Sequence, residues 1–319
     1  MVANDRIEDL LKYQGSSPKP KDFDDYWERA LMELDAQPLD YELEAADFRT
    51  PLAECYHLYF IGVGGARVHA KYVKPRALQR KGPGLALFHG YHTGSGDWFD
   101  KAAYAAHGIT VIALDCRGQG GLSEDNLTVK GTTLKGHIIR GVGEETPDKL
   151  YYRNVFLDLV QTVRILMSME QVDPGRIGVH GCSQGGALTV ACAALEPRVK
   201  LAIPVYPFLT DYKKAWEMEV NTSAYEELAY YFRFMDPLHR TQEAFFNKLG
   251  YIDIQNLADR IRAKVIFVTG LADSICPPYT QFAAYNKIVS EKELVVYHEY
   301  GHEYLPYLSD RVLQEMLRL

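Results

Sequence analysis

Along this 319-residue chain, apolar and polar residues show two patterns, which alternate from one segment to the next. Short apolar runs, most of them ending at glycine or another turn residue, predict buried strands. Longer segments with apolar residues every three or four positions predict helices between those strands. The expected strands are 56–63, 66–74, 85–88, 109–114, 177–180, 199–205, 264–269 and 294–298, and the expected helices are 22–34, 98–106, 151–169, 187–195 and 309–317. Such alternation predicts an α/β fold with a mostly parallel central sheet flanked by helices.

Three parts of the chain depart from this alternation. Residues 1–50 are expected to form a peripheral, mainly helical N-terminal extension, and residues 22–34 within it carry a clear helical stripe. Residues 122–148 are polar and glycine-rich, which indicates either a long functional loop or a mobile one. Aromatic-rich helical segments at about 210–250 indicate an insertion over the carboxyl edge of the sheet, where ligands of α/β folds bind. We expect a single domain over residues 1–319.

A Gly-x-Ser-x-Gly turn separates an apolar strand from a helix in the middle of the chain. Gly181 and Gly185 lack the Cβ atoms that would collide across so tight a turn, and Ser183 is expected there in strained geometry with its hydroxyl exposed. The backbone N–H of Gln184 and the start of the helix point to where an oxyanion would form. Ser183 is therefore the candidate nucleophile, although glycine-rich turns of this kind also bind phosphate or merely pack closely.

A serine nucleophile needs a base, and the base needs a carboxylate that orients it. In α/β-hydrolases the chain order of these groups is Ser, then Asp or Glu, then His. Asp273 follows the apolar strand that begins at Lys264, and His302 lies in a loop after the strand at 294–298. The order Ser183, Asp273, His302 predicts a catalytic triad.

Other residues compete for these roles. His298 belongs to the expected strand and would need a different register to act as the base. Asp211 and Asp253 are alternative carboxylates, but neither follows a convincing strand. We interpret His180, in the strand before the serine, as a core histidine, and His89, which precedes the serine, as a residue that shapes its loop.

A tetrahedral intermediate needs a second oxyanion donor, which in this fold comes from the loop after the third strand. The buried segment 85–88 is followed by His89, Gly90 and Tyr91. We therefore assign the second donor to the backbone N–H of Tyr91.

Composition narrows the classes of function. Hydrophobic residues make up 47% and charged residues 24%, which is ordinary for a globular protein with a large core. The net charge of −7 and the lack of any Lys/Arg run argue against a nucleic-acid partner. The chain shows neither an apolar run long enough to span a membrane nor a signal-peptide pattern, so we expect no membrane partner and a cytoplasmic location.

Cysteine usage argues against a disulfide framework and against a zinc site. The odd number of cysteines fits reduced thiols in a cytosol. Cys182 lies beside Ser183 and is either a second nucleophile or an inert filler, and we favour the filler. The five cysteines are Cys55, Cys116, Cys182, Cys192 and Cys276.

Three short segments resemble, in sequence and in order, the signature motifs of the acetyl xylan esterase and cephalosporin-C deacetylase family, carbohydrate esterase family seven. They are RGQGG at 117–121, GCSQGG at 181–186 and GHE at 301–303, with further matches in HGY at 89–91, YYR at 151–153 and AAYN at 283–286. The resemblance covers essentially the whole chain. It implies an α/β-hydrolase fold with an N-terminal extension.

The resemblance also implies a function. The chain is expected to be a serine esterase that removes acetyl groups from small O-acetylated substrates, such as acetylated xylo-oligosaccharides and cephalosporin C-like acetates, without metal or cofactor. Phe208 and Ile275 are expected to line a small acyl or leaving-group pocket, and Arg117 to hold its loop. Family members typically assemble as hexamers, dimers of trimers, so a homo-hexamer is expected here. The triad Ser183, Asp273 and His302 and the donors Tyr91 and Gln184 agree with the family pattern.

Two departures and two rival functions accompany this resemblance. The loop at 91–98 is shorter than expected, which bears on substrate preference, and Cys182 replaces a small residue, which bears on packing or oxidation. A serine peptidase of the prolyl-oligopeptidase type shares the serine turn and the triad order but normally carries a propeller domain. A non-catalytic α/β-hydrolase relative that binds a ligand would commonly lack a triad member.

Overall fold

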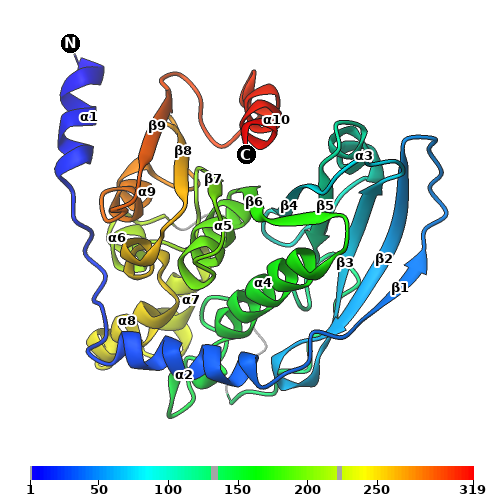
Figure 1. The fold of residues 1–319 in the computed structure, drawn as a ribbon. Coiled ribbons are helices and arrows are strands. Elements are labelled where there is room, and N and C mark those ends of the chain that lie inside the picture. The colour runs from blue at the N-terminus through cyan, green and yellow to red at the C-terminus, as the bar shows by residue number, and fades with distance from the viewer. Residues whose placement is uncertain (1, 131–135, 221–224) are drawn as a thin grey trace.

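The structure is a computed structural model that describes residues 2–130, 136–220 and 225–319. A nine-stranded sheet in the order β1-β2-β3-β5-β4-β6-β7-β8-β9 runs through the molecule (Figure 1). Its strands are β1 (Tyr41–Ala45), β2 (Ala53–Ile61), β3 (Arg67–Pro75), β4 (Gly82–Phe88), β5 (Thr110–Leu114), β6 (Val172–Cys182), β7 (Leu201–Val205), β8 (Lys264–Gly270) and β9 (Lys292–Tyr297).

The sheet is antiparallel at one edge and parallel elsewhere. Strands β1, β2 and β3 pair antiparallel, as do β3 and β5, and every pair from β5 through β9 is parallel. The predicted α/β fold with a mostly parallel sheet is therefore confirmed.

Strand β1 corrects the expectation that the first fifty residues are mainly helical. All five of its residues are exposed, and it pairs only with β2 at the edge of the sheet. Its apolar residues Tyr41, Leu43 and Ala45 do alternate with Glu42 and Glu44, but the run is only five residues long, and the sequence interpretation passed over it.

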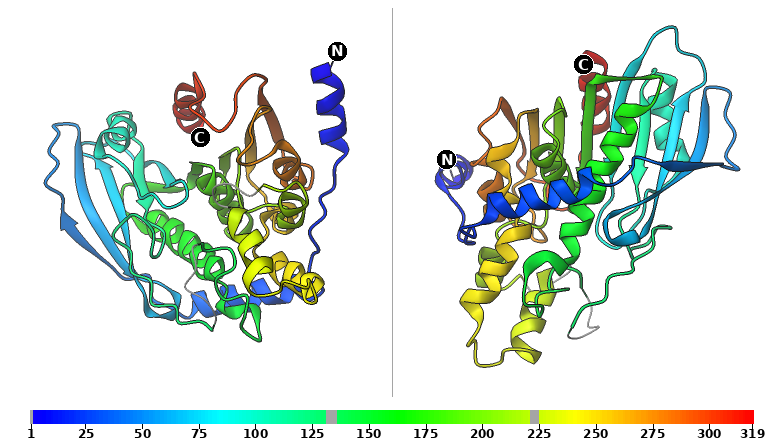
Figure 2. Two further views of the ribbon diagram at one scale, coloured as in Figure 1. Left: turned by 180° about the vertical axis from the view of Figure 1, so that it is seen from behind. Right: turned by 60° about the horizontal axis from the view of Figure 1, so that its bottom comes forward.

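Helices cover both faces of the sheet (Figure 2). One cluster of buried residues contains apolar side chains of α2, α4, α5 and α9, and a second cluster contains those of α3 and α10. Alternate residues of β5 and β8 belong to different clusters, so the two clusters lie on opposite faces of the sheet. No helix among the described residues has the length and apolar character needed to cross a membrane. The helices are α1 (Val2–Lys12), α2 (Phe23–Asp35), α3 (Trp98–Ala106), α4 (Tyr151–Ser168), α5 (Gln184–Leu195), α6 (Tyr212–Glu217), α7 (Glu226–Phe234), α8 (Gln242–Leu249), α9 (Pro278–Tyr285) and α10 (Leu308–Arg318).

Helix α4 has an apolar stripe but no solvent-exposed face. The sequence predicts an amphipathic helix over 151–169, whereas the structure buries nearly every residue of α4. Helix α2 of the extension covers its outer side, where Trp27 stacks on Phe156 with ring centroids 5.8 Å apart. Some polar side chains of α4 bond inside the protein: Gln161 Nε2 donates to the main-chain oxygen of Ile61 at 3.0 Å, and Arg153 donates to Glu33 at 2.6 Å.

A buried ion pair joins α4 to the loop after β5. The Arg117 guanidinium donates to both carboxylate oxygens of Asp158, at 2.5 and 2.7 Å, and both side chains are at most 2% exposed. The pair fixes the segment 117–121 against α4.

Two predicted irregular regions are described only in part. The described part of residues 122–148 holds one short 3₁₀ helix, Pro147–Lys149, and residues 131–135 lie outside the described residues. Helices α6, α7 and α8 lie between β7 and β8, where the sequence predicts a helical insertion, and residues 221–224 of that region lie outside the described residues.

Replacing Asp158 by Ala should lower the free energy of unfolding by about 3–5 kcal/mol, because the Arg117 charge would remain buried without a partner. Urea denaturation of the variant measures this loss. The control is Asp35→Ala: Asp35 lies 2.6 Å from Arg164 but is 59% exposed, and such surface pairs contribute about 0–1 kcal/mol. Equal losses in the two variants would contradict the assignment of a stabilising buried pair.

Candidate active site

Ser183 occupies the tight turn between β6 and α5. Its backbone dihedral angles are φ 61° and ψ −120°, a conformation that costs a non-glycine residue energy. A Cβ atom on Gly181 would lie 2.5 Å from the carbonyl oxygen of Phe88, and one on Gly185 would lie 2.1 Å from it. Only glycine fits at these two positions, so the motif follows from the close approach of β4 to the turn.

The neighbouring strand holds the turn in place. The Ser183 N–H donates to the carbonyl oxygen of Val205 at 3.0 Å, and the Ser183 carbonyl accepts from the N–H of Phe208 at 3.0 Å. These two bonds fix the serine at the carboxyl end of β6, beside the end of β7.

The structure brings the three predicted triad residues together. His302 Nε2 lies 2.9 Å from Ser183 Oγ, and His302 Nδ1 lies 2.9 Å from Asp273 Oδ2. Asp273 follows β8 and His302 follows β9, so the ends of adjacent parallel strands deliver both side chains to one edge of the sheet. The Asp273 side chain is fully buried, and that of His302 is 20% exposed.

Main-chain donors orient the Asp273 carboxylate. Its Oδ1 accepts from the N–H groups of Ile275 at 2.9 Å and Cys276 at 2.8 Å, and its Oδ2 also accepts from Gln281 Nε2 at 3.4 Å. A carboxylate held in this way accepts a hydrogen bond from His302 Nδ1–H and leaves the Nε2 lone pair facing the serine hydroxyl. The arrangement has the geometry of a serine activated by a general base.

The predicted oxyanion donors lie on either side of this turn. Gln184 is the first residue of α5, so its N–H has no acceptor inside the helix and lies at the positive end of the helix dipole. Tyr91 lies just beyond β4, the strand that pairs with β6.

A pair of side-chain amides connects these two donors, which the sequence alone did not reveal. Gln119 and Gln184 donate to each other at 2.8 and 3.0 Å, and Gln184 Oε1 also accepts from the Tyr152 hydroxyl at 2.8 Å. Gln119 Oε1 in turn accepts from the N–H of His92 at 2.9 Å. The pair therefore links the segment 117–121, the serine turn and the loop of Tyr91. Gln119 belongs to the RGQGG motif at 117–121, but the family resemblance assigned a role only to Arg117 of that motif.

The remaining histidines have other partners. Both ring nitrogens of His89 face the main chain: Nδ1 lies 2.7 Å from the Gly90 oxygen, and Nε2 accepts from the N–H of Cys116 at 2.9 Å. The Nδ1 of His180 lies 2.9 Å from a main-chain oxygen of β7, and burial lowers the pKa of this imidazole. His298 lies just past the end of β9 rather than inside the strand, and it is exposed.

The alternative carboxylates support the fold away from His302. Asp211 accepts from the N–H groups of Ser16 and Ser17, at 3.1 and 2.8 Å, and so anchors the N-terminal segment. The buried Asp253 accepts from the N–H of Asp211 at 3.0 Å.

The two predicted pocket residues lie next to the triad. The Phe208 side chain is 1% exposed, and its ring centroid lies 5.5 Å from that of Tyr91 and 4.6 Å from that of Tyr225. Ile275 is half-buried, and its N–H is one of the donors to Asp273. Their role in contacting substrate stays a prediction.

Two cysteines lie close to the serine. Burial raises the pKa of Cys182 to about 11, which keeps its thiol protonated and unreactive near neutral pH. Sequence reasoning passed over Cys276, which is fully buried; in the described part of the chain, ligand atoms of Asp273, Cys276 and His302 lie within 4.8 Å of one another, as in a metal site. A metal ion there would take its imidazole ligand from the triad.

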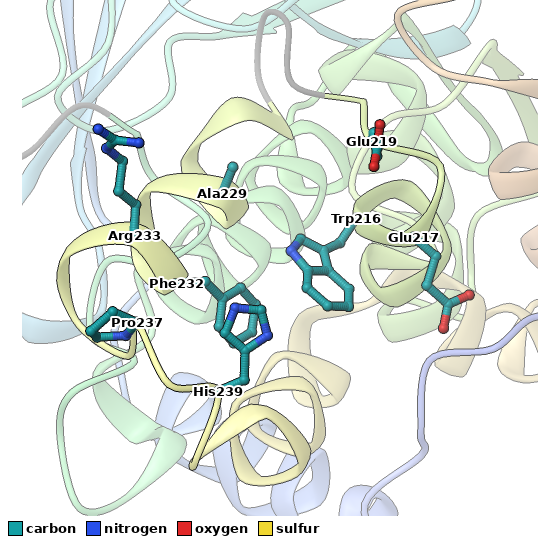
Figure 3. Close-up of a pocket in the computed structure, with 8 residues that line it drawn as sticks. All are labelled: Trp216, Glu217, Glu219, Ala229, Phe232, Arg233, Pro237 and His239. Atoms are coloured by element: carbon teal, nitrogen blue, oxygen red, sulfur yellow. The ribbon is translucent and has the colours of Figure 1, made fainter.

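A cavity of about 700 Å³ lies in the insertion rather than at the triad. Figure 3 shows the rings of Trp216, Phe232 and His239 gathered between the helices, with Glu217 and Arg233 toward its sides. None of its lining residues belongs to the triad or supplies the predicted oxyanion donors.

A family model described as acetyl xylan esterase (AXE1) matches residues 1–318. Acetyl esterase Axe7A of Xylanibacter ruminicola is 25% identical over 291 residues, which are 87% of this chain and 62% of that protein. The chain therefore spans less than two thirds of the length of that curated relative.

Solved structures agree with the family match. Acetyl xylan esterase 1 from Thermoanaerobacterium sp. JW/SL YS485 is 50% identical, with a TM-score of 0.95 and 98% of each chain covered. Acetyl xylan esterase from Paenibacillus sp. R4 is 34% identical, with a TM-score of 0.92 and coverage of 97% of this chain and 98% of that one. The α/β-hydrolase fold predicted from the sequence is confirmed.

The stability of the protein should depend on pH through Asp253. Burial and the neighbouring Asp211 raise the pKa of Asp253 to about 6, above the value of about 3.9 for an unfolded chain. Between these values the folded state holds a proton that the unfolded state has lost, so this group's contribution to stability falls as pH rises. The difference in unfolding free energy between wild type and Asp253→Asn should therefore decrease from about pH 4 to about pH 7. Urea denaturation across this range measures it, and a constant difference would contradict the raised pKa.

Proposed function

The chain belongs to the acetyl xylan esterase family, whose members are carboxylic ester hydrolases, and we propose that it is a serine esterase that deacetylates small O-acetylated molecules. The observation that carries the proposal is the chain of hydrogen bonds from Ser183 Oγ through His302 to Asp273, each link 2.9 Å long. The substrates that we propose are acetylated xylo-oligosaccharides and acetates similar to cephalosporin C.

The first half of the reaction forms an acetyl-enzyme. Ser183 Oγ attacks the acetyl carbonyl carbon while His302 Nε2 takes the hydroxyl proton, and Asp273 stabilises the resulting imidazolium. The N–H groups of Tyr91 and Gln184 bind the oxyanion, and one such donor typically lowers the barrier by about 3 kcal/mol. When the intermediate collapses, His302 returns the proton to the leaving alcohol.

The second half releases acetate. A water molecule gives a proton to His302 Nε2 and attacks the acetyl carbonyl, and the same two N–H groups bind the second oxyanion. Collapse of this intermediate breaks the bond to Ser183 Oγ, which recovers its proton from His302. Apart from the substrate and this water molecule, the proposed chemistry uses only side chains and main-chain groups of this protein.

We propose that Phe208 and Ile275 border the space for the acetyl group or the leaving alcohol. The buried ring of Phe208 supports this role because it packs against Tyr91, whose N–H is one of the proposed oxyanion donors. The short loop at 91–98 adjoins the same space and is the segment that we expect to set the preference among alcohols.

The organisation of the protein forms part of the same proposal. We propose a single domain with an N-terminal extension at 1–50 and a helical insertion at about 210–250, assembled as a homo-hexamer in the cytoplasm. The cytoplasmic location is supported by the cysteines, because all five are free thiols in the structure. The hexamer rests on family resemblance.

Wild-type protein should release acetate from acetylated xylo-oligosaccharides or from cephalosporin C, and Ser183→Ala should release none while remaining folded. NMR detection of acetate and circular dichroism measure the two properties. Cys182→Ala is the control, and it should keep most of the activity because its thiol is protonated and does not serve as nucleophile. Hydrolysis of peptide amides without any acetate release would favour a peptidase, and failure of a fluorophosphonate to label Ser183 would favour a non-catalytic binding protein.

Asp273→Asn should reduce kcat by about 10⁴-fold, because an amide cannot hold the imidazole in the required tautomer or stabilise its positive charge. Asp253→Asn provides a matched control, since it also neutralises a buried carboxylate but at a position away from His302. Steady-state kinetics on p-nitrophenyl acetate compare the two variants. Similar kcat values for both would exclude Asp273 as the orienting carboxylate.

A further inference from the structure

Glu227 places a buried carboxylate against one of the proposed oxyanion donors. It belongs to α7 in the insertion and is 1% exposed. Its Oε1 accepts from the Tyr91 hydroxyl at 3.0 Å, and its Oε2 accepts from the N–H of Ile139 at 2.9 Å. The N–H of His137 lies 2.8 Å from the Tyr91 hydroxyl oxygen and 3.2 Å from Glu227 Oε1. One carboxylate therefore connects the insertion, the segment 137–139 and the loop after β4.

The carboxylate is costly to bury, so the donors around it matter. Burial raises the pKa of Glu227 to about 8, and the hydrogen bonds from Tyr91 and the main chain oppose that rise. Near neutral pH the group is therefore mostly protonated, and only its ionised form raises the pKa values of the fully buried Tyr152 and Tyr212. A carboxyl group as deeply buried as that of Glu227 lowers the stability of the folded protein unless hydrogen-bond partners surround it.

The main chain closes tightly around this carboxylate. Gly136 has φ +119°, and a Cβ atom there would lie 2.3 Å from the carboxyl carbon of Glu227. Only glycine allows the segment that supplies the N–H groups to approach so closely.

The loop that carries Tyr91 needs an external anchor. His92 has φ 62°, a left-handed conformation that is strained for a residue with a side chain. The side-chain oxygen Oε1 of Gln119 accepts a hydrogen bond from the N–H of His92 at 2.9 Å. The tyrosine ring packs on Phe208, and its hydroxyl binds Glu227 from the side of the insertion. These contacts hold the Tyr91 side chain and the peptide that follows it. The Gly90 carbonyl oxygen, in the same peptide plane as the Tyr91 N–H, lies 2.7 Å from His89 Nδ1 and accepts from Thr93 Oγ1 at 2.8 Å.

We propose that Glu227 is a positioning residue of the esterase, which orients the oxyanion-binding N–H of Tyr91 by holding the tyrosine hydroxyl. This inference rests on the proposed function, in which that N–H stabilises the oxyanion. It gives the insertion a part in the chemical step, because α7 fixes an element of the oxyanion hole in addition to covering the sheet edge.

The test is a double-mutant cycle of Glu227→Gln and Tyr91→Phe, with kcat and KM measured on p-nitrophenyl acetate. Complete removal of an oxyanion donor costs about 10²–10³ in kcat, so a displaced donor should cost less, about 10-fold. Each single variant should lower kcat by about this factor with little change in KM, because the donor acts mainly in the transition state. The double variant should be no slower than the slower single variant, because both substitutions act on the same contact. Phe removes the hydroxyl, and Gln leaves one acceptor oxygen where Tyr91 and Ile139 now bind two.

Asp253→Asn is the control for a purely structural effect. Asp253 is another buried carboxylate that main-chain N–H groups hold, and it has no contact with Tyr91 among the hydrogen bonds between described residues. Its kcat should match wild type even if its thermal midpoint falls. A Glu227→Gln variant with a lower midpoint but unchanged kcat would overturn the proposal, as would losses that multiply in the double variant.

A failure of the proposed function can be distinguished from a failure of the positioning role of Glu227. If the wild type hydrolyses p-nitrophenyl acetate but neither acetylated xylo-oligosaccharides nor cephalosporin C, the substrate assignment fails and the cycle still tests Glu227. If it hydrolyses no ester, the rate at which a fluorophosphonate labels Ser183 replaces kcat, because phosphonylation also develops a negative oxygen in the oxyanion hole. Equal labelling rates for wild type and Glu227→Gln would then overturn the positioning role.

Discussion

The close approach of β4 to the serine turn is the constraint on which the rest of the site depends. The carbonyl oxygen of Phe88 occupies the space that a side chain at Gly181 or Gly185 would need. This packing allows α5 to begin directly at the end of β6 and holds Ser183 in a strained conformation. The same strand continues into the loop of Tyr91. One contact between backbones therefore sets both the position of the proposed nucleophile, Ser183, and the separation between the two proposed oxyanion donors.

Buried and half-buried polar side chains connect this centre to the parts of the chain that surround it. The amide pair of Gln119 and Gln184 joins the segment after β5 to the serine turn, and the ion pair of Arg117 and Asp158 joins the same segment to α4. Glu227 adds the insertion through Tyr91. In a medium of low dielectric constant, such groups are strongly favourable when all partners are present and costly when one is missing. The network thus makes the geometry of the proposed oxyanion donors depend on the packing of several distant segments.

The family match and the site geometry contribute different kinds of support. Many unrelated activities share the α/β-hydrolase fold, so the fold alone does not choose a substrate. The match over residues 1–318 narrows the chemistry to ester hydrolysis, and the hydrogen-bonded Ser183, His302 and Asp273 supply a physical route for it. In the proposed function, Phe208, Ile275 and the loop at 91–98 determine which alcohol leaves.

Local pattern was sufficient to predict the alternation of strands and helices, the serine turn and the order of the triad, because each depends on residues close together in sequence. Gly181, Ser183 and Gly185 lie within one turn, and Asp273 and His302 follow apolar strands whose carboxyl ends a parallel sheet brings to one edge. Tertiary structure decided the features that depend on distant partners. Strand β1 exists because β2 offers an edge, and α4 is buried on all sides because α2 covers it. The partners of Gln119 and Glu227 come from segments tens of residues away, and no periodicity in the sequence specifies which polar groups will meet.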